Sequence, residues 1–373
     1  MKRLLLYFRR FNLKTFNVWL VLAVMALNIY GILVVSSADS AYKSKEIIGM
    51  VGGCIVMMAV AFIDYNLVVK YRWIIYGVMM ALLLSVLIFG DEGGGATRWI
   101  DLGFIRFQPS EMVKILIILY FSAFFMLHQL TVSTWRTFGI AVALIAVPLA
   151  LIFKEPDLST TIVSALIFIS LLFCAGLSYK MIGTLLAIFV PLAGIFFYLI
   201  TREGQTILHE YQYGRIMSFF HPEEYADQWY QQENSMMAIG SGGLMGKGLN
   251  TMDAMSVKNG NYISEPHTDF IFAIVGEELG FAGTFCLILL LFFVVLLCIL
   301  IAKRAKNLTG RLICVGFAAY IGFQSFVNIA VVTGLMPNTG LPLPFISYGL
   351  TSLISSYVGV GFVLNVSMQP NKR

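Results

Sequence analysis

Charged side chains are scarce in this chain. Asp, Glu, Lys and Arg make up 12% of the 373 residues, whereas hydrophobic residues make up 59%. A water-soluble domain of this size needs a largely polar surface, and so few charges cannot supply one. The shortage excludes an ordinary soluble enzyme and favours a chain embedded in a lipid bilayer.

Cysteine is also rare, and basic residues are not concentrated anywhere. The five cysteines lie inside apolar runs without metal-ligand spacing, so they indicate packing and neither a disulfide framework nor a zinc site. The net charge is +5, but the Lys and Arg residues are not interleaved with stacking aromatics in a soluble domain, which excludes a nucleic-acid partner. The cysteines are Cys54, Cys174, Cys286, Cys298 and Cys314.

Long apolar runs fill most of the chain instead. About ten of them have the roughly 17 to 25 residues that cross a bilayer as a helix. We therefore predict an all-α, polytopic membrane protein with residues 1–373 forming a single domain. The eighth run is longer than one crossing needs, so it should tilt strongly or protrude. The runs are 18–38, 47–63, 73–90, 112–128, 137–153, 158–177, 181–200, 269–302, 311–336 and 349–368.

Lys and Arg predict the orientation in the membrane. An even number of spans places both termini on one side, and about fifteen Lys and Arg residues lie there against about five opposite, the longest loop set aside. We therefore expect the chain in the cytoplasmic membrane, with both termini on the cytoplasmic side. The long polar loop 201–268, between spans seven and eight, should then be extracytoplasmic. No internal repeat is visible, which argues against a transporter.

The segment Ser264–Gly280, SEPHTDFIFAIVGEELG, concentrates ionisable residues where the eighth run begins. Asp269 lies at the mouth of this run, where a carboxylate is costly unless it has a function. It could act as a general base or a metal ligand at the outer surface, or simply interact with the helix dipole. Glu277 and Glu278 lie deeper, and we expect them to be paired inside the bundle.

Two further polar groups stand where outer loops meet apolar runs. Glu111 and Lys114 are three residues apart, so they share a helix face and can form an ion pair. Alternatively, with Arg98 nearby, they could hold a diphosphate or orient a sugar. Asp157 opens the sixth run, where helix capping and catalysis explain it equally well.

A glycine-rich stretch, residues 238–248, invites comparison with a nucleotide-binding phosphate loop. The comparison fails because Ser241 stands where the first glycine is needed and Gly248 where Ser or Thr is needed. A plain hairpin loop is one interpretation. The other is a turn whose backbone N–H groups face a lipid diphosphate, with Arg215 and Lys247 adding positive charge.

Prolines and glycines interrupt the helix between the last two runs. Non-helical backbone at membrane depth is tolerated where protein buries it or where it lines a cavity. Ser347 and Tyr348 are therefore candidate pocket residues. No His or Lys lies near Ser347 in the sequence, so acyl chemistry is not expected.

Five segments, in order along the chain, resemble the signatures of the RodA/FtsW/SpoVE (SEDS) family of bacterial shape, elongation, division and sporulation proteins. RWIDLG and FQPSE look closest to RodA. Two departures are Glu155, where the family usually has Gln, and Leu350, where it usually has Gly. The segments are RWIDLG with FQPSEMVK, EPDLSTT, AIGSGGLMGKGL, HTDFIFAIVGEELG and PNTGLPLPFISYG.

The resemblance implies a peptidoglycan glycosyltransferase at the outer face of the membrane. Such a protein polymerises lipid II, the undecaprenyl-diphosphate-linked disaccharide-pentapeptide, beside a class B penicillin-binding protein that cross-links the glycan. The essential aspartate of the family falls on Asp269, and its acid–lysine pair falls on Glu111 and Lys114. Cell elongation, division and sporulation are all compatible roles.

The chemistry of such a transfer assigns further roles as hypotheses. Asp269 would take the proton of the attacking sugar hydroxyl. Positive charge for the leaving diphosphate would come from some of Arg98, Lys114, Arg215 and Lys247, and a divalent cation, Mg²⁺ or Mn²⁺, could assist. Two alternatives stay open: a lipid II flippase, and a scaffold for the transpeptidase without catalysis of its own.

Overall fold

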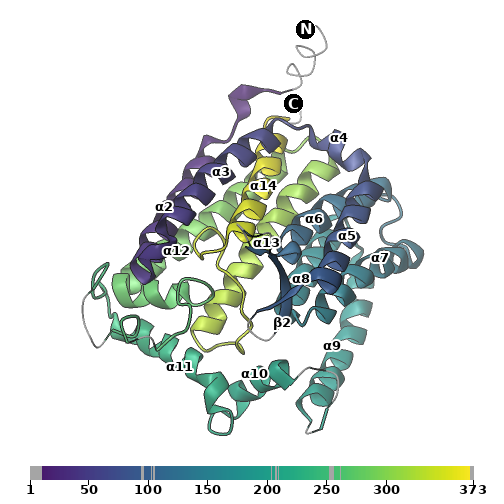
Figure 1. Cartoon of the computed structure of the whole chain (residues 1–373). Helices are drawn as coiled ribbons and strands as arrows, with labels where there is room; N and C mark the ends of the chain where they lie inside the picture. Colours follow the sequence, from purple (N-terminus) through teal and green to yellow (C-terminus); the bar gives the residue numbers. More distant parts are fainter. Residues whose placement is uncertain are drawn as a thin grey trace.

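Helices dominate the structure and run side by side as one bundle (Figure 1). The computed structural model describes residues 11–93, 96–101, 103, 106–202, 204–205, 208, 210–251, 256–260 and 262–369.

Each of the ten predicted runs corresponds to one apolar helix, which confirms the predicted fold class. In the described part of the chain, nine helices are long and apolar enough to cross a membrane, and α8 is a shorter apolar helix. They are α2 (Val18–Ala38), α3 (Lys43–Ala61), α5 (Arg72–Phe89), α6 (Pro109–Leu127), α7 (Trp135–Lys154), α8 (Leu158–Cys174), α9 (Tyr179–Thr201), α12 (Ile271–Arg304), α13 (Leu308–Val332) and α14 (Leu350–Ser367).

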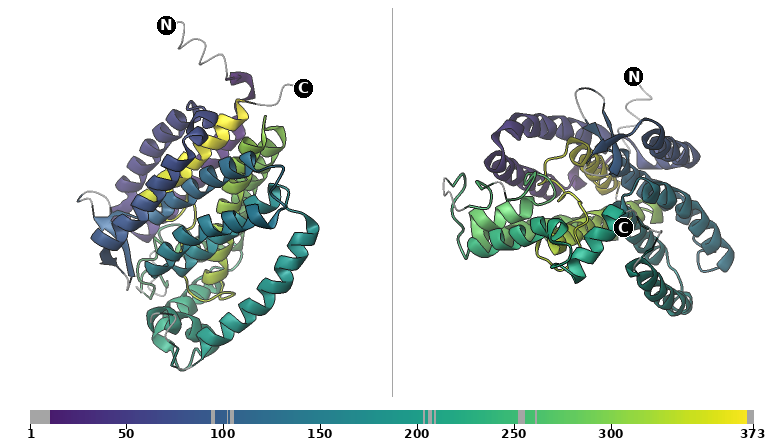
Figure 2. Two further views of the ribbon diagram at one scale, coloured as in Figure 1. Left: turned by 90° about the vertical axis from the view of Figure 1, so that its right-hand side faces the viewer. Right: turned by 60° about the horizontal axis from the view of Figure 1, so that its bottom comes forward.

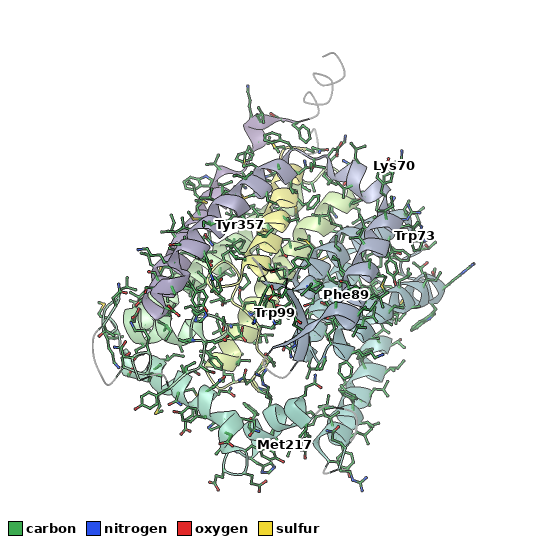
Figure 3. The ribbon with its side chains drawn as sticks, viewed as in Figure 1. Lys70, Trp73, Phe89, Trp99, Met217 and Tyr357 are labelled. Carbon is green, nitrogen blue, oxygen red and sulfur yellow. The ribbon has the colours of Figure 1, made fainter. Side chains whose placement is uncertain are left out.

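The bundle has two chemically different ends. Asn12 and Met368 meet at one end, where the Asn12 N–H donates to the Met368 carbonyl at 2.8 Å. Lys70, the last residue of α4 (Tyr65–Lys70), lies at this terminal end, and Met217 lies at the opposite end (Figure 3). We call the opposite end the loop end, because the described parts of the loop 201–268 lie there (Figure 1).

Short elements build the loop end. A three-stranded antiparallel sheet follows α5, with β1 (Asp91–Gly93), β2 (Ala96–Asp101) and β3 (Arg106–Phe107) in that order. The long loop contains α10 (Glu210–Phe220) and α11 (Ala226–Ser241), and the 3₁₀ turn η2 (Ser40–Tyr42) follows α2. A second 3₁₀ turn, η1 (Leu13–Thr15), follows Asn12 at the terminal end. The all-α prediction did not include the sheet.

The centre of the bundle is formed by α6, α13 and α14, whose residues are mostly buried. Glycines allow close helix contacts there. A Cβ at Gly359 of α14 would lie 2.2 Å from the ring of Phe317, and one at Gly53 of α3 would lie 2.1 Å from the ring of Tyr357. Small residues at helix contacts are how membrane helices gain dispersion energy, because lipid supplies no hydrophobic drive.

One helix stands away from this bundle. Of the residues of α9, only Met181 and Ile200 are buried, and both views of Figure 2 show the helix running along the outside. Its exposed side chains are largely apolar, so they suit contact with lipid. The face of the bundle beside α9 therefore lacks the close helix packing found at its centre.

The eighth predicted run corresponds to α12, which is interrupted within its length. Gly280, inside α12, has φ +63° and ψ −161°, so a short helix ending at Leu279 meets a longer one. The loop after α11 supplies partners at the break: the Phe281 and Ala282 N–H groups donate to the carbonyls of Gly243 and Leu244 at 2.9 and 3.0 Å. The run is therefore not one continuous helix, because glycine tolerates a conformation that ends a helix. Its expected tilt or protrusion stays a prediction.

This contact predicts a strong difference between two neighbouring glycines. A Cβ at Gly242 would lie 1.9 Å from the Gly276 carbonyl oxygen, whereas nothing lies within 4 Å of one at Gly240. We expect Gly242→Ala to lower the free energy of unfolding by about 1–3 kcal/mol, because the added methyl group overpacks this contact. Gly240→Ala, in the last turn of α11, two residues before Gly242, should be neutral or stabilising. Thermal unfolding of the purified protein in detergent checks both; equal midpoints would contradict the backbone contact.

Candidate active site

Asp269 lies at the loop end, two residues before α12 begins. The side-chain amide of Asn328, from α13, donates to the Asp269 carbonyl at 2.7 Å and to the Leu341 carbonyl at 2.6 Å. One buried amide thus fixes the backbone of Asp269 against the connection between α13 and α14. Asp269 as a whole residue is half-buried.

Arg215 faces Asp269 across a glycine. A Cβ at Gly340 would lie 3.1 Å from Asp269 Oδ2 and 3.3 Å from Arg215 Nη1. Gly340 has φ +68°, a left-handed conformation that glycine adopts without strain. The structure therefore brings α10 of the long loop to the carboxylate, as expected if Arg215 adds positive charge there.

Burial raises the pKa of Asp269 to about 6, although the Arg215 and Arg98 guanidiniums act in the opposite direction. The carboxylates of Asp157 and Glu265 add smaller upward contributions. With this pKa, Asp269 is mostly ionised at neutral pH and is a stronger base than a solvated aspartate. That combination suits proton transfer from a hydroxyl group.

Arg98 and Asp157 form a second polar group at the same end. Asp157 caps α8: Thr160 donates to its carboxylate from the backbone N–H at 3.0 Å and from the hydroxyl at 2.9 Å. Arg98, in β2, lies 4.0 Å from the same carboxylate and donates to the Pro156 carbonyl at 2.6 Å. The capping interpretation of Asp157 therefore holds, and its carboxylate is already occupied.

Glu111 and Lys114 form a buried ion pair inside the protein. Their side chains are 1% and 0% exposed, and Lys114 Nζ lies 2.7 Å from Glu111 Oε1. Lys114 also donates to Gln324 Oε1 at 2.5 Å, and Gln324 in turn donates to the Pro342 carbonyl at 2.9 Å. The geometry favours the structural ion pair over the predicted contact of Lys114 with a diphosphate, because the Lys114 ammonium is already bonded to Glu111 and Gln324.

Ser347 is buried as well. Its hydroxyl oxygen accepts from the Leu343 N–H at 2.6 Å, so it closes a turn. The Ser159 hydroxyl donates to the Thr339 carbonyl and joins α8 to the same connection. The predicted exposure of Ser347 to a pocket is not supported by this arrangement.

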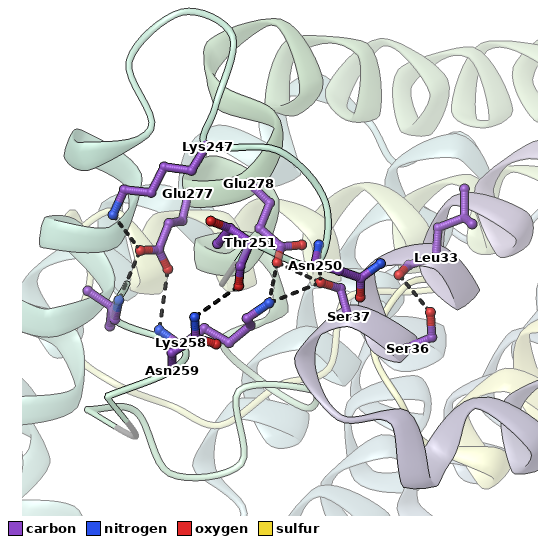
Figure 4. A network of polar contacts seen from close by, with 11 residues as sticks. Leu33, Ser36, Ser37, Lys247, Asn250, Thr251, Lys258, Asn259, Glu277 and Glu278 are labelled. Atoms are coloured by element: carbon purple, nitrogen blue, oxygen red, sulfur yellow. Dashed lines mark hydrogen bonds and ion pairs between the residues drawn. The ribbon is translucent and has the colours of Figure 1, made fainter. Parts of the chain in front are cut away.

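Lys247 is bonded to Glu277 in a separate polar network (Figure 4). Its ammonium lies 2.8 Å from Glu277 Oε1, and its backbone N–H donates to the Glu277 carbonyl at 2.9 Å. Lys258 pairs with Glu278 at 2.5 Å. The prediction that Glu277 and Glu278 are paired is confirmed, and the predicted diphosphate contact of Lys247 is not supported, because its charge is neutralised in this network.

The candidate site does not fit a metal ion. Within the described ranges, no three His, Cys, Asp or Glu side chains gather closely enough to hold one. The charged groups that act most strongly on Asp269 are the guanidiniums of Arg215 and Arg98, which repel a cation. The site residues therefore provide positive charge themselves, and we derive no step through Mg²⁺ or Mn²⁺.

Sequence reasoning missed the two amides that position this site. Gln324 and Asn328 lie four residues apart in an otherwise apolar run, so they share one face of α13. A buried amide in a membrane helix needs hydrogen-bond partners, and this spacing was an available signal. Their partners could not be read from the sequence, because the carbonyls belong to irregular backbone.

An aromatic group borders the α3 side of the site. The Tyr42 ring stacks on His267 with centroids 4.2 Å apart and contacts Tyr348 at 4.4 Å. The Tyr348 N–H donates to the His267 carbonyl at 2.9 Å. Tyr348, a candidate pocket residue, is thereby tied to the segment that carries Asp269.

These observations define a multi-pass membrane protein with an aspartate–arginine site at the loop end of its bundle. A family model described as "Cell cycle protein", for FtsW, RodA and SpoVE, matches residues 15–372. The chain belongs to this family, as its sequence signatures predicted.

Two curated relatives cover most of the chain. One is the peptidoglycan glycosyltransferase MrdB of Escherichia coli K12, 35% identical, with 93% of this chain and 92% of MrdB aligned. The other is the probable peptidoglycan glycosyltransferase FtsW of Bacillus subtilis strain 168, 32% identical, with 95% and 91% aligned.

Solved structures show the same architecture. A chain from work on "structural coordination of polymerization and crosslinking by a peptidoglycan synthase complex" superposes with a TM-score of 0.77 at 26% identity, covering 94% of this chain and 97% of that one. The rod shape determining protein RodA of Thermus thermophilus superposes with a TM-score of 0.69 at 25% identity, covering 96% and 98%.

The buried ion pair predicts a coupled effect on stability. Among the described residues, Lys114 is the only charged partner that the structure shows bonded to Glu111. Lys114→Met should therefore lower the free energy of unfolding by about 3–5 kcal/mol, because it leaves the Glu111 charge buried and unpaired. Adding Glu111→Gln should recover much of this loss, because no unpaired charge stays buried. Thermal unfolding of the single and double variants measures the coupling, and additive losses would contradict it.

Proposed function

We propose that the chain is a peptidoglycan glycosyltransferase that polymerises lipid II into glycan strands. The observation that carries the proposal is the half-buried Asp269, whose carboxylate faces Arg215 across Gly340 at the loop end. A base next to fixed positive charge is what sugar transfer from a diphosphate requires. The named activity of the curated relatives supports the proposal.

The proposed reaction is a single displacement. The 4-hydroxyl oxygen of one GlcNAc attacks C1 of a MurNAc that is linked to undecaprenyl diphosphate, and the C1–O bond to the diphosphate breaks. Asp269 takes the hydroxyl proton, and the diphosphate leaves with the bonding electron pair. Attack on an α-linked donor inverts C1, and no ATP is consumed because the diphosphate is already a good leaving group.

Arg98 and Arg215 are the proposed diphosphate ligands. Both act electrostatically on Asp269, so both lie close enough to stabilise charge that develops beside it. Lys114 and Lys247 are left out of this role, because each is bonded to a glutamate. Asp157 holds Arg98 in place and does not itself contact substrate.

The proposed setting is the cytoplasmic membrane, with the terminal end in the cytoplasm and the loop end outside. The excess of Lys and Arg at the terminal end supports this orientation. Both substrates are lipids, so the site should open sideways, and the exposed position of α9 supports such an opening. A class B penicillin-binding protein is the proposed partner, consistent with the synthase complex that contains a structural neighbour.

A lipid II flippase is the second candidate. It would need polar groups along a path through both leaflets. The described ion pairs lie between Glu111 and Lys114 and at the loop end, and a large cluster of buried apolar side chains dominates the described core. This distribution favours chemistry at one surface over transport across the membrane.

Asp269→Asn tests the base directly. The amide keeps the size of the side chain but cannot take a proton, so polymer formation should fall by about 100-fold or more. Purified protein with its transpeptidase partner in liposomes, supplied with lipid II and scored for glycan strands, measures the effect. Asp227→Asn, the same change at an exposed position of α11, is the control. Undiminished polymer from Asp269→Asn would eliminate the assignment, and lipid II translocation without polymer would favour the flippase.

The pKa of Asp269 predicts the acid side of the pH profile. Because the base must be deprotonated and its pKa is about 6, the rate should fall as the pH drops through about 6. A solvated aspartate would place this fall about two pH units lower. Initial rates of polymerisation at constant ionic strength locate the midpoint, and activity that persists unchanged at about pH 4.5 would refute Asp269 as a base with this pKa.

A further inference from the structure

A second carboxyl group at the loop end has no partner. Glu155, between α7 and α8, is 1% exposed, and neither of its carboxylate oxygens has a hydrogen-bond partner among the described residues. Buried polar groups are rarely left unbonded, because the lost hydration is not replaced. An unbonded carboxyl therefore points to a ligand that completes it.

Glu155 belongs to the neighbourhood of the candidate site. The charged groups that act on it are Asp157 and Arg98, and both also act on Asp269. Phe153 and Leu158, on either side of Glu155, pack against Ile200, Leu208 and Ile216. Ile216 is adjacent to Arg215 in the chain. The apolar contact that flanks Glu155 therefore also positions the helix that carries Arg215, the arginine that faces Asp269.

The neighbouring groups cannot satisfy Glu155. The Asp157 carboxylate accepts from Thr160, and one Arg98 nitrogen, Nη2, donates to the Pro156 carbonyl. Arg98 Nε is itself buried without a partner among the described residues. The other charged residues on α7, α9 and α10 and just after α9 are the half-buried Arg215 and five exposed residues, Arg136, Lys154, Lys180, Arg202 and Glu210.

Burial raises the pKa of Glu155 to about 8, Asp157 adds to the rise, and Arg98 opposes it. The group is therefore mostly protonated at neutral pH, with one O–H donor and one carbonyl acceptor. An unbonded carboxylic acid beside an unbonded guanidinium N–H provides two donors at one place. Two adjacent donors match an anionic oxygen ligand such as a phosphate.

We propose that Glu155, as a neutral carboxylic acid, binds the diphosphate of the lipid-linked sugar together with Arg98. Its O–H donates to a phosphate oxygen, and Arg98 Nε donates beside it. This inference rests on the proposed function, because that function supplies the diphosphate. Glu155 is then a substrate-binding residue that must keep its proton to work, while Asp269 must lose its proton.

The two carboxyl groups together predict a bell-shaped pH profile. Glu155 is competent below its pKa, so activity should fall as the pH rises through about 8, where an anion next to Asp157 would repel the diphosphate. Glu155→Gln keeps a donor and an acceptor but cannot ionise. It should retain the neutral rate within about 3-fold and lose the alkaline fall.

Glu155→Ala removes the donor and should raise the KM for lipid II by about 10-fold or more, with a smaller effect on kcat. The assays use the protein with its transpeptidase partner in liposomes, between about pH 5 and about pH 9. Glu223→Gln, at an exposed position of the loop end, is the matched control and should keep the wild-type profile. Thermal unfolding of each variant at each pH verifies that the protein is folded.

Three results would overturn the proposal. They are an alkaline fall that persists unchanged in Glu155→Gln, an unchanged KM in Glu155→Ala, and a Glu155→Gln variant that loses both stability and neutral activity. The last result would make Glu155 an ionised structural partner of Arg98. Binding of fluorescent lipid II, measured separately, distinguishes the two proposals: if wild type binds but makes no polymer, the proposed function fails, whereas weaker binding by Glu155→Ala still supports the ligand role.

Discussion

The side-chain amide of Asn328 holds together the two segments that make the candidate site. It donates to the carbonyls of Asp269 and Leu341, and these carbonyls belong to irregular backbone that no helix could satisfy. In a bilayer, such groups must be bonded inside the protein. The amide meets this requirement and places the Asp269 carboxylate beside Gly340 and Arg215.

The same constraint sorts the charged residues into two kinds. Lys114, Lys247 and Lys258 each lie against a glutamate and are neutralised inside the protein. Arg98 and Arg215 instead act on the carboxylate of Asp269, a half-buried residue. Charges of the first kind hold helices and loops in place, and charges of the second kind are those that we propose for contact with a diphosphate.

Proton affinity then separates the carboxyl groups at the loop end. Asp157 has its oxygens occupied by hydrogen bonds, whereas Asp269 and Glu155 are both raised in pKa by burial, to about 6 and about 8. Near neutral pH, one of these two is mostly ionised and the other is mostly protonated. A site that must take one proton and donate one hydrogen bond can use such a pair.

The sequence by itself determined the ten apolar helices and the concentration of polar chemistry between them, and it made Asp269 the leading candidate for the site, because span length and the cost of an intramembrane charge are local properties. It could not determine which of four candidate cations reach that aspartate. In the sequence, Lys114 and Arg215 look equally suitable as partners of Asp269. In the structure, Lys114 is buried in an ion pair with Glu111, whereas Arg215 faces Asp269 across Gly340. Only the tertiary structure decided which cation reaches Asp269, because that choice depends on the break at Gly280 and on contacts between residues far apart in the chain. A buried charge pairs with whichever opposite charge the packing places beside it.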